Sequence, residues 1–269
     1  MSAARDFFKL QGAAALRQRS RHRQFRFHFG FPRRELLPVR ARARRGSFDG
    51  RFALRAGTSD RRVFEQIFLE EQYDLARLAR WSELRRGAEA AALPPLVLDL
   101  GANIGMASLF FAHLMPRAAL LAVEPEAANF ARLEVHCAQL GARAQCVRAA
   151  AAGSDGTARV VAGGGATASF RTETGGGAGA VPAWSVPSLL ARRPDAAPFL
   201  LKCDIEGAER EVFAGDASWL DLFPIVMVEP HDWMLPGERT ARPLLEALAR
   251  RDRELLILGE SLISLAPVA

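Results

Sequence analysis

One stretch of the chain combines residue types that can bind a nucleoside. In Asp99-Leu-Gly-Ala-Asn-Ile-Gly105, Gly101 and Gly105 lack a Cβ, so the backbone can turn sharply and approach a ligand closely. Asn103 lies between them and can cap a following helix with its side chain. Glu124 ends the next apolar run, where its carboxylate can accept hydrogen bonds from both hydroxyls of a ribose. These residues predict a nucleoside site.

The spacing of the glycines separates two nucleoside cofactors. Nicotinamide dinucleotides favour Gly-x-Gly-x-x-Gly, which brings a pyrophosphate onto the amides of a helix. This turn has no third glycine at the expected place. S-adenosylmethionine has no phosphate and does not require one, and Asp99 can face its cationic amino end. The predicted residues for binding S-adenosylmethionine are Asp99, Gly101, Asn103, Gly105 and Glu124. An NAD(P)-dependent oxidoreductase is the alternative enzyme.

Two later stretches supply groups for a chemical step. Lys202-Cys-Asp-Ile-Glu-Gly-Ala-Glu209 contains Asp204 and Glu206, which are two residues apart, so both could face the same side if the segment is extended. We expect Asp204 beside the sulfonium or the acceptor and Glu206 on the acceptor hydroxyls, unless these acids only favour a helix amino end through its dipole. His231, in Glu229-Pro-His-Asp-Trp233, has a pKa suited to a general base, and a structural role is its alternative. Asp204, Glu206 and His231 are the predicted catalytic residues.

The elements that must position these stretches alternate along the chain. Apolar runs typical of strands, some of them weak, occur at 96–100, 120–123, 144–149, 158–161, 199–203, 225–228, 254–258 and 262–265. Apolar residues at helical spacing occur at 63–78, 106–114, 130–137 and 243–250. This alternation predicts an α/β fold, a mainly parallel sheet with helices on both faces. Ligands of such folds bind beyond the carboxyl ends of the strands, where the three stretches lie.

The first fifty residues differ in composition from the rest. Five arginines are interleaved with four phenylalanines: Arg17, Arg19, Arg21, Arg23 and Arg26 with Phe25, Phe27, Phe29 and Phe31. Such interleaving can stack single-stranded bases, but it is more typical of a short strand or a solvated arm. We predict a basic extension over 1–50 and one catalytic domain over 51–269, in which the Gly-rich stretch 163–180 is a loop or a lid. A non-catalytic binding protein that uses the Arg-rich arm is a further alternative.

Charge and cysteine content restrict the partners. The net charge of +6 would suit nucleic acid, but charge without a recognition element is a weak signal, so nucleic acid is not the expected partner. Cys137, Cys146 and Cys203 have no C-x-x-C spacing, which argues against a disulfide framework and a zinc site. No metal-ligand constellation stands out, and no metal is expected. No apolar run is long enough to span a bilayer. A cytoplasmic protein is predicted, with an organellar transit peptide as the alternative.

From about Gly57 onward the chain resembles the FkbM family of methyltransferases. The resemblance rests on GTSDRRVFEQIFLEEQYD, VLDLGANIG, AVEPE, LKCDIEGAERE and VMVEPHDW, and the order of VLDLGANIG and KCDIEGAE is specific. It implies the class I methyltransferase Rossmann-like fold with a seven-stranded, mostly parallel sheet. It also implies methyl transfer from S-adenosylmethionine, commonly to a hydroxyl of a small molecule, sugar or peptide. One departure is Arg148-Ala-Ala-Ala-Ala152, which has no acid for the adenine amino group, so backbone groups or Asp155 are expected to replace it.

Overall fold

The computed structural model describes residues 17–19, 25–30, 36–43, 48–162, 170–174, 177 and 179–267. The chain divides into two compact units after Glu71. The predicted end of the basic extension, residue 50, falls within a strand of the first unit. No helix in the described ranges has the length and apolar character needed to cross a membrane.

The first unit is built on a four-stranded antiparallel sheet in sequential order. Its strands are β1 (Arg17–Arg19), β2 (Phe25–Phe29), β3 (Leu36–Ala43) and β4 (Asp49–Arg55). Helix α2 (Asp60–Phe64) follows and continues as a π-helical turn, Glu65–Leu69. The predicted helix over 63–78 is therefore wrong in its extent. Glu71, with φ at 57°, ends it, and a separate 3₁₀ turn forms at Leu75–Arg77.

Two of the interleaved phenylalanines, Phe25 and Phe27, lie in the core of this unit. Period-two alternation in β2 buries Phe25 and Phe27 completely and leaves Arg26 exposed. The ring of Phe25 lies 5.2 Å from that of Phe68, and the ring of Phe27 lies 5.5 Å from that of Phe64. Rings packed in a core cannot stack on bases. The strand interpretation is confirmed for Phe25–Phe29, whereas Arg21, Arg23 and Phe31 lie outside the described residues.

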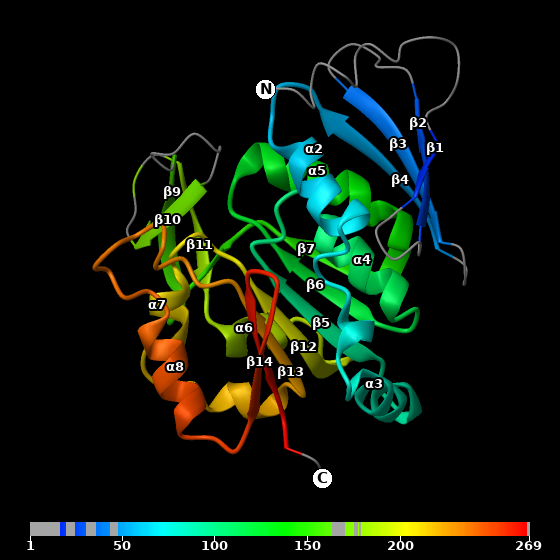
Figure 1. Ribbon diagram of the computed structural model, residues 1–269. Helices are drawn as coiled ribbons and strands as arrows, with labels where there is room; N and C mark the ends of the chain where they lie inside the picture. The colour runs from blue at the N-terminus through cyan, green and yellow to red at the C-terminus, as the bar shows by residue number, and fades with distance from the viewer. Residues whose placement is uncertain are drawn as a thin grey trace. The chain divides into compact units, whose positions relative to one another are not determined.

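The second unit contains the predicted sheet, with seven strands in the order β14-β15-β13-β12-β5-β6-β7 (Figure 1). The strands are β5 (Pro95–Leu100), β6 (Ala119–Val123), β7 (Ala144–Val147), β12 (Ala197–Cys203), β13 (Ile225–Val228), β14 (Glu254–Leu258) and β15 (Ser261–Leu265). Neighbours from β13 through to β7 pair in parallel, and β15 is antiparallel to both of its neighbours. The α/β fold class with a mostly parallel seven-stranded sheet is confirmed.

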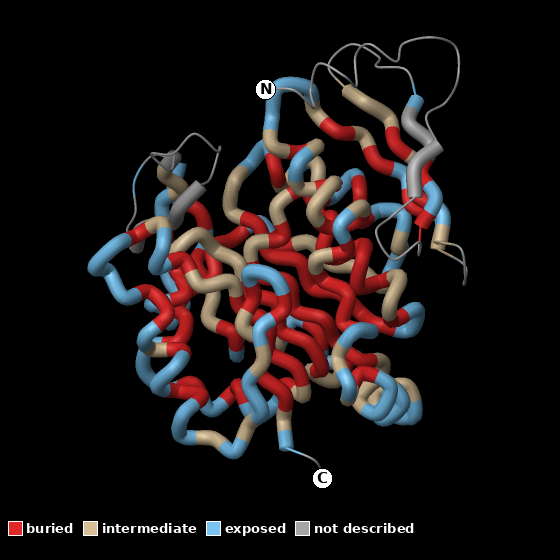
Figure 2. Tube along the Cα trace, viewed as in Figure 1, coloured by how far each residue is buried: buried red, intermediate tan, exposed pale blue. Residues whose placement is uncertain are grey.

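Helices cover both faces of this sheet, as Figure 1 shows. The helices are α3 (Trp81–Ala90), α4 (Met106–Leu114), α5 (Ala127–Cys137), α6 (Val186–Leu190), α7 (Glu209–Phe213) and α8 (Arg242–Ala249). Alternate residues of β5, such as Leu98 and Leu100, belong to one apolar core with α6, α7 and α8. On the opposite face Ala122 packs with Leu133 and Cys137 of α5. The buried residues accordingly run through the centre of the unit (Figure 2).

A second, smaller sheet has the order β10-β9-β11-β8. Its strands are β8 (Ala150–Ala151), β9 (Gly156–Ala162), β10 (Phe170–Thr174) and β11 (Ala180–Trp184). The predicted loop over 163–180 is wrong at its centre, because Phe170–Thr174 pairs with β9. An aromatic residue and two threonines favour that strand, and the surrounding glycines hid the signal. Residues 163–169 lie outside the described part of the chain.

Candidate active site at the carboxyl ends of the parallel strands

Strand order reverses between β5 and β12, so the segments after these two strands meet at the switch point of the sheet. The turn after β5 has left-handed backbone at Gly101 (φ 73°), Asn103 (φ 50°) and Gly105 (φ 87°). The amides of Gly101 and Ala102 donate to the carbonyl of Val123, which holds the turn against the end of β6. The N-cap of α4 is Gly105, so the prediction that Asn103 caps this helix was wrong. Asparagine instead meets the conformational demand of the turn, since it tolerates positive φ better than most residues.

Gly101 is required by the neighbouring segment. A Cβ at this position would lie 1.7 Å from the carbonyl oxygen of Asp204. The amide of Asp204 in turn donates to the carbonyl of Leu100 at 3.1 Å. The glycine therefore lets two backbone segments touch, and the two sequence stretches predicted to share a site lie directly against each other.

A buried ion pair stands behind this contact. Lys202 and Asp99 are register partners on β12 and β5, so their side chains leave the sheet on the same face. Nζ of Lys202 lies 3.1 Å from Oδ1 of Asp99 and donates to the carbonyl of Gly101 at 2.7 Å. Burial lowers the pKa of Lys202, but Asp99 and Asp204 outweigh it and raise the pKa well above its ordinary value. Ser108 donates to the other oxygen of Asp99, so both carboxylate oxygens face groups of the protein itself.

Glu124 lies beside the turn, as the sequence predicted for a residue ending the second strand. Its side chain is buried and accepts the amides of Asn103 and Glu126, both at 2.9 Å. Burial raises the pKa of Glu124 to about 7 despite these hydrogen bonds. A carboxylate has about four lone-pair positions, so capacity for two further donors remains. The two amide hydrogen bonds fix the orientation of the Glu124 carboxylate and therefore of its remaining lone pairs.

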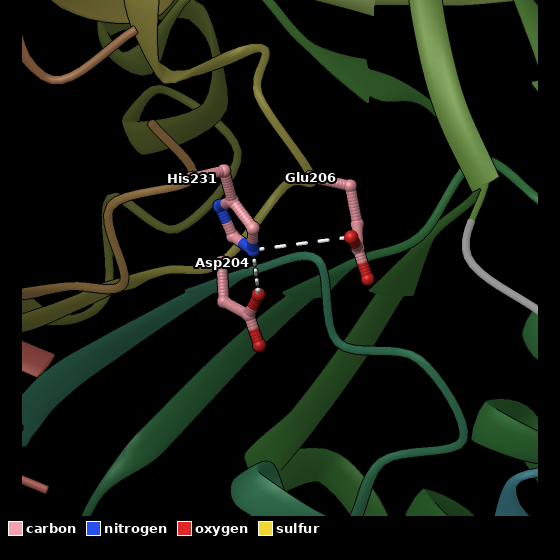
Figure 3. A group of neighbouring side chains, drawn as sticks. All are labelled: Asp204, Glu206 and His231. Carbon is pink, nitrogen blue, oxygen red and sulfur yellow. Dashed lines mark ion pairs between the residues drawn. The ribbon is translucent and has the colours of Figure 1, made fainter. Parts of the chain in front are cut away.

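The predicted catalytic residues come together where β12 and β13 end (Figure 3). Nε2 of His231 lies 3.6 Å from Oδ1 of Asp204 and 3.9 Å from Oε2 of Glu206. Glu229, which follows β13 directly, places Oε1 at 4.0 Å from the same nitrogen. The other ring nitrogen, Nδ1, donates to Oε1 of Glu209 at 2.9 Å. One buried imidazole thus faces three carboxylates with one nitrogen and a fourth with the other.

Crowded carboxylates change the protonation of this cluster. Burial lowers the pKa of His231, but the hydrogen bond and charge of Glu209, together with Asp204 and Glu206, raise it to about 9. Burial and the charge of Asp204 raise the pKa of Glu206, and they raise that of Glu229 to about 7. The raised pKa favours the imidazolium form of His231, and in that form the ring cannot accept a proton. The role of His231 as the base stays a prediction.

The segments that form this site lie within a stretch that matches a known protein family. Residues 99–254, more than half of the chain, match the family model described as the methyltransferase FkbM domain. The chain belongs to the FkbM methyltransferase family. The family resemblance predicted from the sequence is thereby confirmed.

Individual proteins are similar to this chain either over a short stretch or at low sequence identity. A stretch of 76 residues is 38% identical to the AMB antimetabolite synthetase AmbE of Pseudomonas aeruginosa, and it spans 28% of this chain and 3% of that protein. The methyltransferase FkbM of Methylobacillus flagellatus KT is 15% identical, with a TM-score of 0.45 over 63% of this chain and 42% of that one. A putative caffeoyl-CoA O-methyltransferase from Staphylococcus aureus is 12% identical, with a TM-score of 0.39 over 73% and 99% of the two chains.

Membership of the FkbM family implies S-adenosylmethionine as the methyl donor, and the turn fits a cofactor without phosphates. The cation at the turn, Lys202, is already committed to Asp99 and to the carbonyl of Gly101. The residue that follows Gly105 is the fully buried Met106. The acid beside the turn, Glu124, suits hydroxyl donors. This donor set favours a ribose over a pyrophosphate.

Four residues of the site were not assigned from the sequence of this FkbM-family protein: Lys202, Glu209, Glu229 and Tyr73. Lys202 carried a usable signal, because a lysine inside an apolar strand run needs a buried partner. Tyr73 is the single tyrosine of the chain; it is buried and stacks on Phe111 at 5.7 Å. Burial raises its pKa well above the ordinary value, and Asp204 and Glu229 add to that rise. Asp155, the predicted substitute for the missing adenine acid, instead accepts hydrogen bonds from Ser185 and Ser188 at the start of α6.

Proposed function

We propose that this protein transfers a methyl group from S-adenosylmethionine to a hydroxyl oxygen of a small molecule, sugar or peptide. One observation carries the proposal: the carboxylates of Asp204, Glu206 and Glu229 converge within 4.0 Å of Nε2 of a fourth titratable side chain, His231. They lie against the glycine turn, whose Gly101 touches the backbone of Asp204. A site for the methyl donor thus adjoins groups that can bind and deprotonate an alcohol.

The donor side of the proposed site consists of the turn after β5 and Glu124. When bound, the cofactor supplies a methyl group on a sulfonium, which makes it an electrophile. Glu124 binds the ribose hydroxyls with the lone pairs that the amides of Asn103 and Glu126 leave open. Gly101 and Gly105 allow the left-handed backbone and the close contacts with Asp204 and Leu133 that shape the turn. Asp99 acts on this side through the turn itself, because its ion pair with Lys202 holds the carbonyl of Gly101.

The acceptor side must hold a hydroxyl in line with the methyl group and receive its proton. In the transfer the acceptor oxygen forms a bond to the methyl carbon, the carbon–sulfur bond breaks, and its electron pair stays on sulfur. The hydroxyl proton leaves to a base. Asp204 and Glu206 are carboxylates at the edge of the sheet that adjoins the donor side, and the raised pKa of Glu206 makes it a better proton acceptor than an ordinary glutamate. His231, as an imidazolium, orients both of them.

The two alternative functions receive less support. A dinucleotide-dependent oxidoreductase needs a glycine where this chain has buried Met106, and Lys202 is not free to bind phosphate. A nucleic-acid-binding arm would use exposed aromatic rings, but Phe25 and Phe27 are fully buried. Neither alternative accounts for the carboxylates around His231.

Donor binding is tested by isothermal titration calorimetry with S-adenosylmethionine. Glu124→Ala should weaken binding about 100-fold, because hydrogen bonds to a charged group contribute about 1.5–3 kcal/mol each. Glu134→Gln, on the exposed side of α5, is the matched control and should bind as the wild type does. Equal affinity in Glu124→Ala would remove this residue from the donor site.

Methyl transfer is tested with labelled donor and a pooled extract of hydroxylated metabolites. Asp204→Asn and His231→Ala should lower the rate at least tenfold while donor affinity stays within twofold, since positioned acid–base groups contribute about 10²–10⁴ to rate. An undiminished rate in both variants would remove the cluster from the reaction. Label recovered on nitrogen or carbon, with none on oxygen, would reject a hydroxyl as the acceptor.

A further inference from the structure

The cluster at the ends of β12 and β13 has the dimensions of a metal site. One ligand atom from each of Asp204, Glu206 and His231 can be chosen so that all lie within 4.8 Å of one another. Two ligand atoms that share an ion at about 2.1 Å lie at most about 4.2 Å apart. The distances from Nε2 of His231, 3.6 Å to Asp204 and 3.9 Å to Glu206, already meet that limit. The third pair, between Asp204 and Glu206, lies within 4.8 Å, and the side chain of Glu206 is about one-third exposed.

A second observation is the orientation of His231. Its side chain is only 3% exposed, and Nδ1 donates to Glu209, so a metal ion that displaces the Nε2 proton would bind the lone pair on Nε2. Nε2 points into the cluster (Figure 3) and makes no hydrogen bond with any described residue. Histidines that bind metals usually donate their other ring nitrogen to a carboxylate or a carbonyl in this way. Glu209 is itself fixed, since it also accepts the amide of Ile205.

Charge balance points the same way. Asp204, Glu206 and Glu229 surround Nε2, and Glu209 lies on the far side of the ring. Oε2 of Glu209 is buried and has no hydrogen-bond partner among the described residues. The nearby cation, Lys202, lies 3.6 Å from Asp204 but is already balanced by Asp99 at 3.1 Å. Four carboxyl groups are thus gathered around one histidine, and a divalent cation is a ligand that such a group of acids can hold.

We infer that Asp204, Glu206 and His231 bind a divalent cation, with Glu229 as a further oxygen ligand. Two or three carboxylates with one imidazole suit a cation of intermediate softness, such as Mn²⁺ or Zn²⁺. The sequence analysis expected no metal, because the ligands come from two strand ends without a recognisable spacing. The sheet brings them together, since β12 and β13 are parallel neighbours that end at the same edge.

The role of this cation in catalysis rests on the proposed function. A cation at Nε2 of His231 lies where the acceptor hydroxyl is expected, and coordination of that oxygen lowers its pKa. The proton then leaves to solvent or to a carboxylate, while the oxygen forms its bond to the methyl carbon and the sulfur keeps the electron pair. Binding of the cation itself requires neither donor nor acceptor, so the two proposals can fail separately.

The experiment titrates MnCl₂ into the chelator-treated full-length protein without methyl donor, followed by calorimetry and by the loss of the free Mn²⁺ electron paramagnetic resonance signal. We expect one cation per chain. Asp204→Asn and His231→Ala should abolish it, and Glu209→Gln should weaken it about 10- to 100-fold, as second ligand layers do. Glu246→Gln, an exposed acid of α8 paired with Arg242, is the control and should bind as the wild type does.

Circular dichroism establishes that each variant is folded, and Asp204→Asn keeps the shape of its side chain. The absence of Mn²⁺ binding by the folded wild type, with Zn²⁺ failing in the same titration, would overturn the inference. So would a Mn²⁺ site whose affinity is the same in folded Asp204→Asn and in the wild type. Donor binding measured on the same samples keeps this outcome distinct from a failure of the proposed function.

Discussion

The two halves of the proposed site, which lie side by side at one edge of the sheet, differ in how their charges are balanced. On the donor side, at the ends of β5 and β6, Asp99 is paired with Lys202 and hydrogen-bonded to Ser108, and Glu124 accepts two amides. On the acceptor side, at the ends of β12 and β13, three carboxylates face one nitrogen of His231 at 3.6–4.0 Å.

The difference in charge balance indicates that the donor side holds a fixed geometry, whereas the acceptor side supplies reactive groups. Short hydrogen bonds and a matched ion pair hold the turn in one conformation, which is what a cofactor cradle requires. Acids crowded around a histidine have perturbed pKa values, which are typical of groups that move protons or hold cations. The fold therefore fixes the conformation of the donor side. On the acceptor side, the carboxylates around His231 still need a ligand or a proton to balance their charge.

The largest expected effect breaks the balance of the donor side. Lys202→Met leaves Asp99 buried without its partner, and loss of one member of a buried pair costs about 3–5 kcal/mol. The free energy of unfolding from chemical denaturation should fall by that amount. The double variant Asp99→Asn/Lys202→Met should lose much less, because no buried charge remains. Equal losses in the single and double variants would show that packing, and not charge, is what Lys202 contributes.

The next effect tests the contact that joins the two halves. Gly101→Ala should destabilise the protein more than Gly57→Ala, although both glycines have nearly the same φ, +73° and +74°. The left-handed backbone costs about 1–2 kcal/mol in either variant. Only Gly101 adds a clash with the carbonyl of Asp204, since nothing lies within 4 Å of a Cβ at Gly57. Denaturation curves of equal midpoint would contradict the close approach.

A smaller effect concerns the pH dependence of donor binding, which depends on Glu124. With the pKa of Glu124 at about 7, its carboxylate is mostly ionised at pH 8 and mostly protonated at pH 6. Because ionised acceptors make the stronger hydrogen bonds, affinity for the donor should fall up to about tenfold as the pH falls across this window. Glu124→Gln should bind weakly at both values and show a flatter profile, and calorimetry at the two pH values measures the difference. A wild-type profile as flat as that of the variant would count against ionised Glu124 as the ribose acceptor.

The smallest effect on stability concerns Trp233, which follows the acceptor cluster. Its side chain is 73% exposed, so Trp233→Ala should change the free energy of unfolding by no more than about 0.5 kcal/mol. If the indole forms a wall for the acceptor, KM for the acceptor should rise several-fold with donor affinity unchanged. Steady-state kinetics with the acceptor found in the metabolite screen provides the test. An unchanged KM would place Trp233 outside the acceptor site.

Local patterns predicted most of the main sheet. The run at 225–228 is β13, which is buried throughout as expected for a central parallel strand, and the run at 254–258 is β14, an edge strand that is largely exposed. Failures occurred where tertiary contacts override local preference. Glu71 adopts a left-handed backbone that ends the first predicted helix, and β10 forms within a Gly-rich stretch because β9 is available to pair with it.

The sequence by itself determined the family, the fold class and the stretches from which the site is built, because these depend on residue type, order and periodicity along the chain. Only the tertiary structure decided the charge states and the partners. Lys202 reaches Asp99 across the sheet, and His231 faces the acids of another strand. Burial and distance between groups far apart in sequence set those interactions, and neither quantity is encoded by local spacing. The physical reason is that a carboxylate acquires its role from the charges around it.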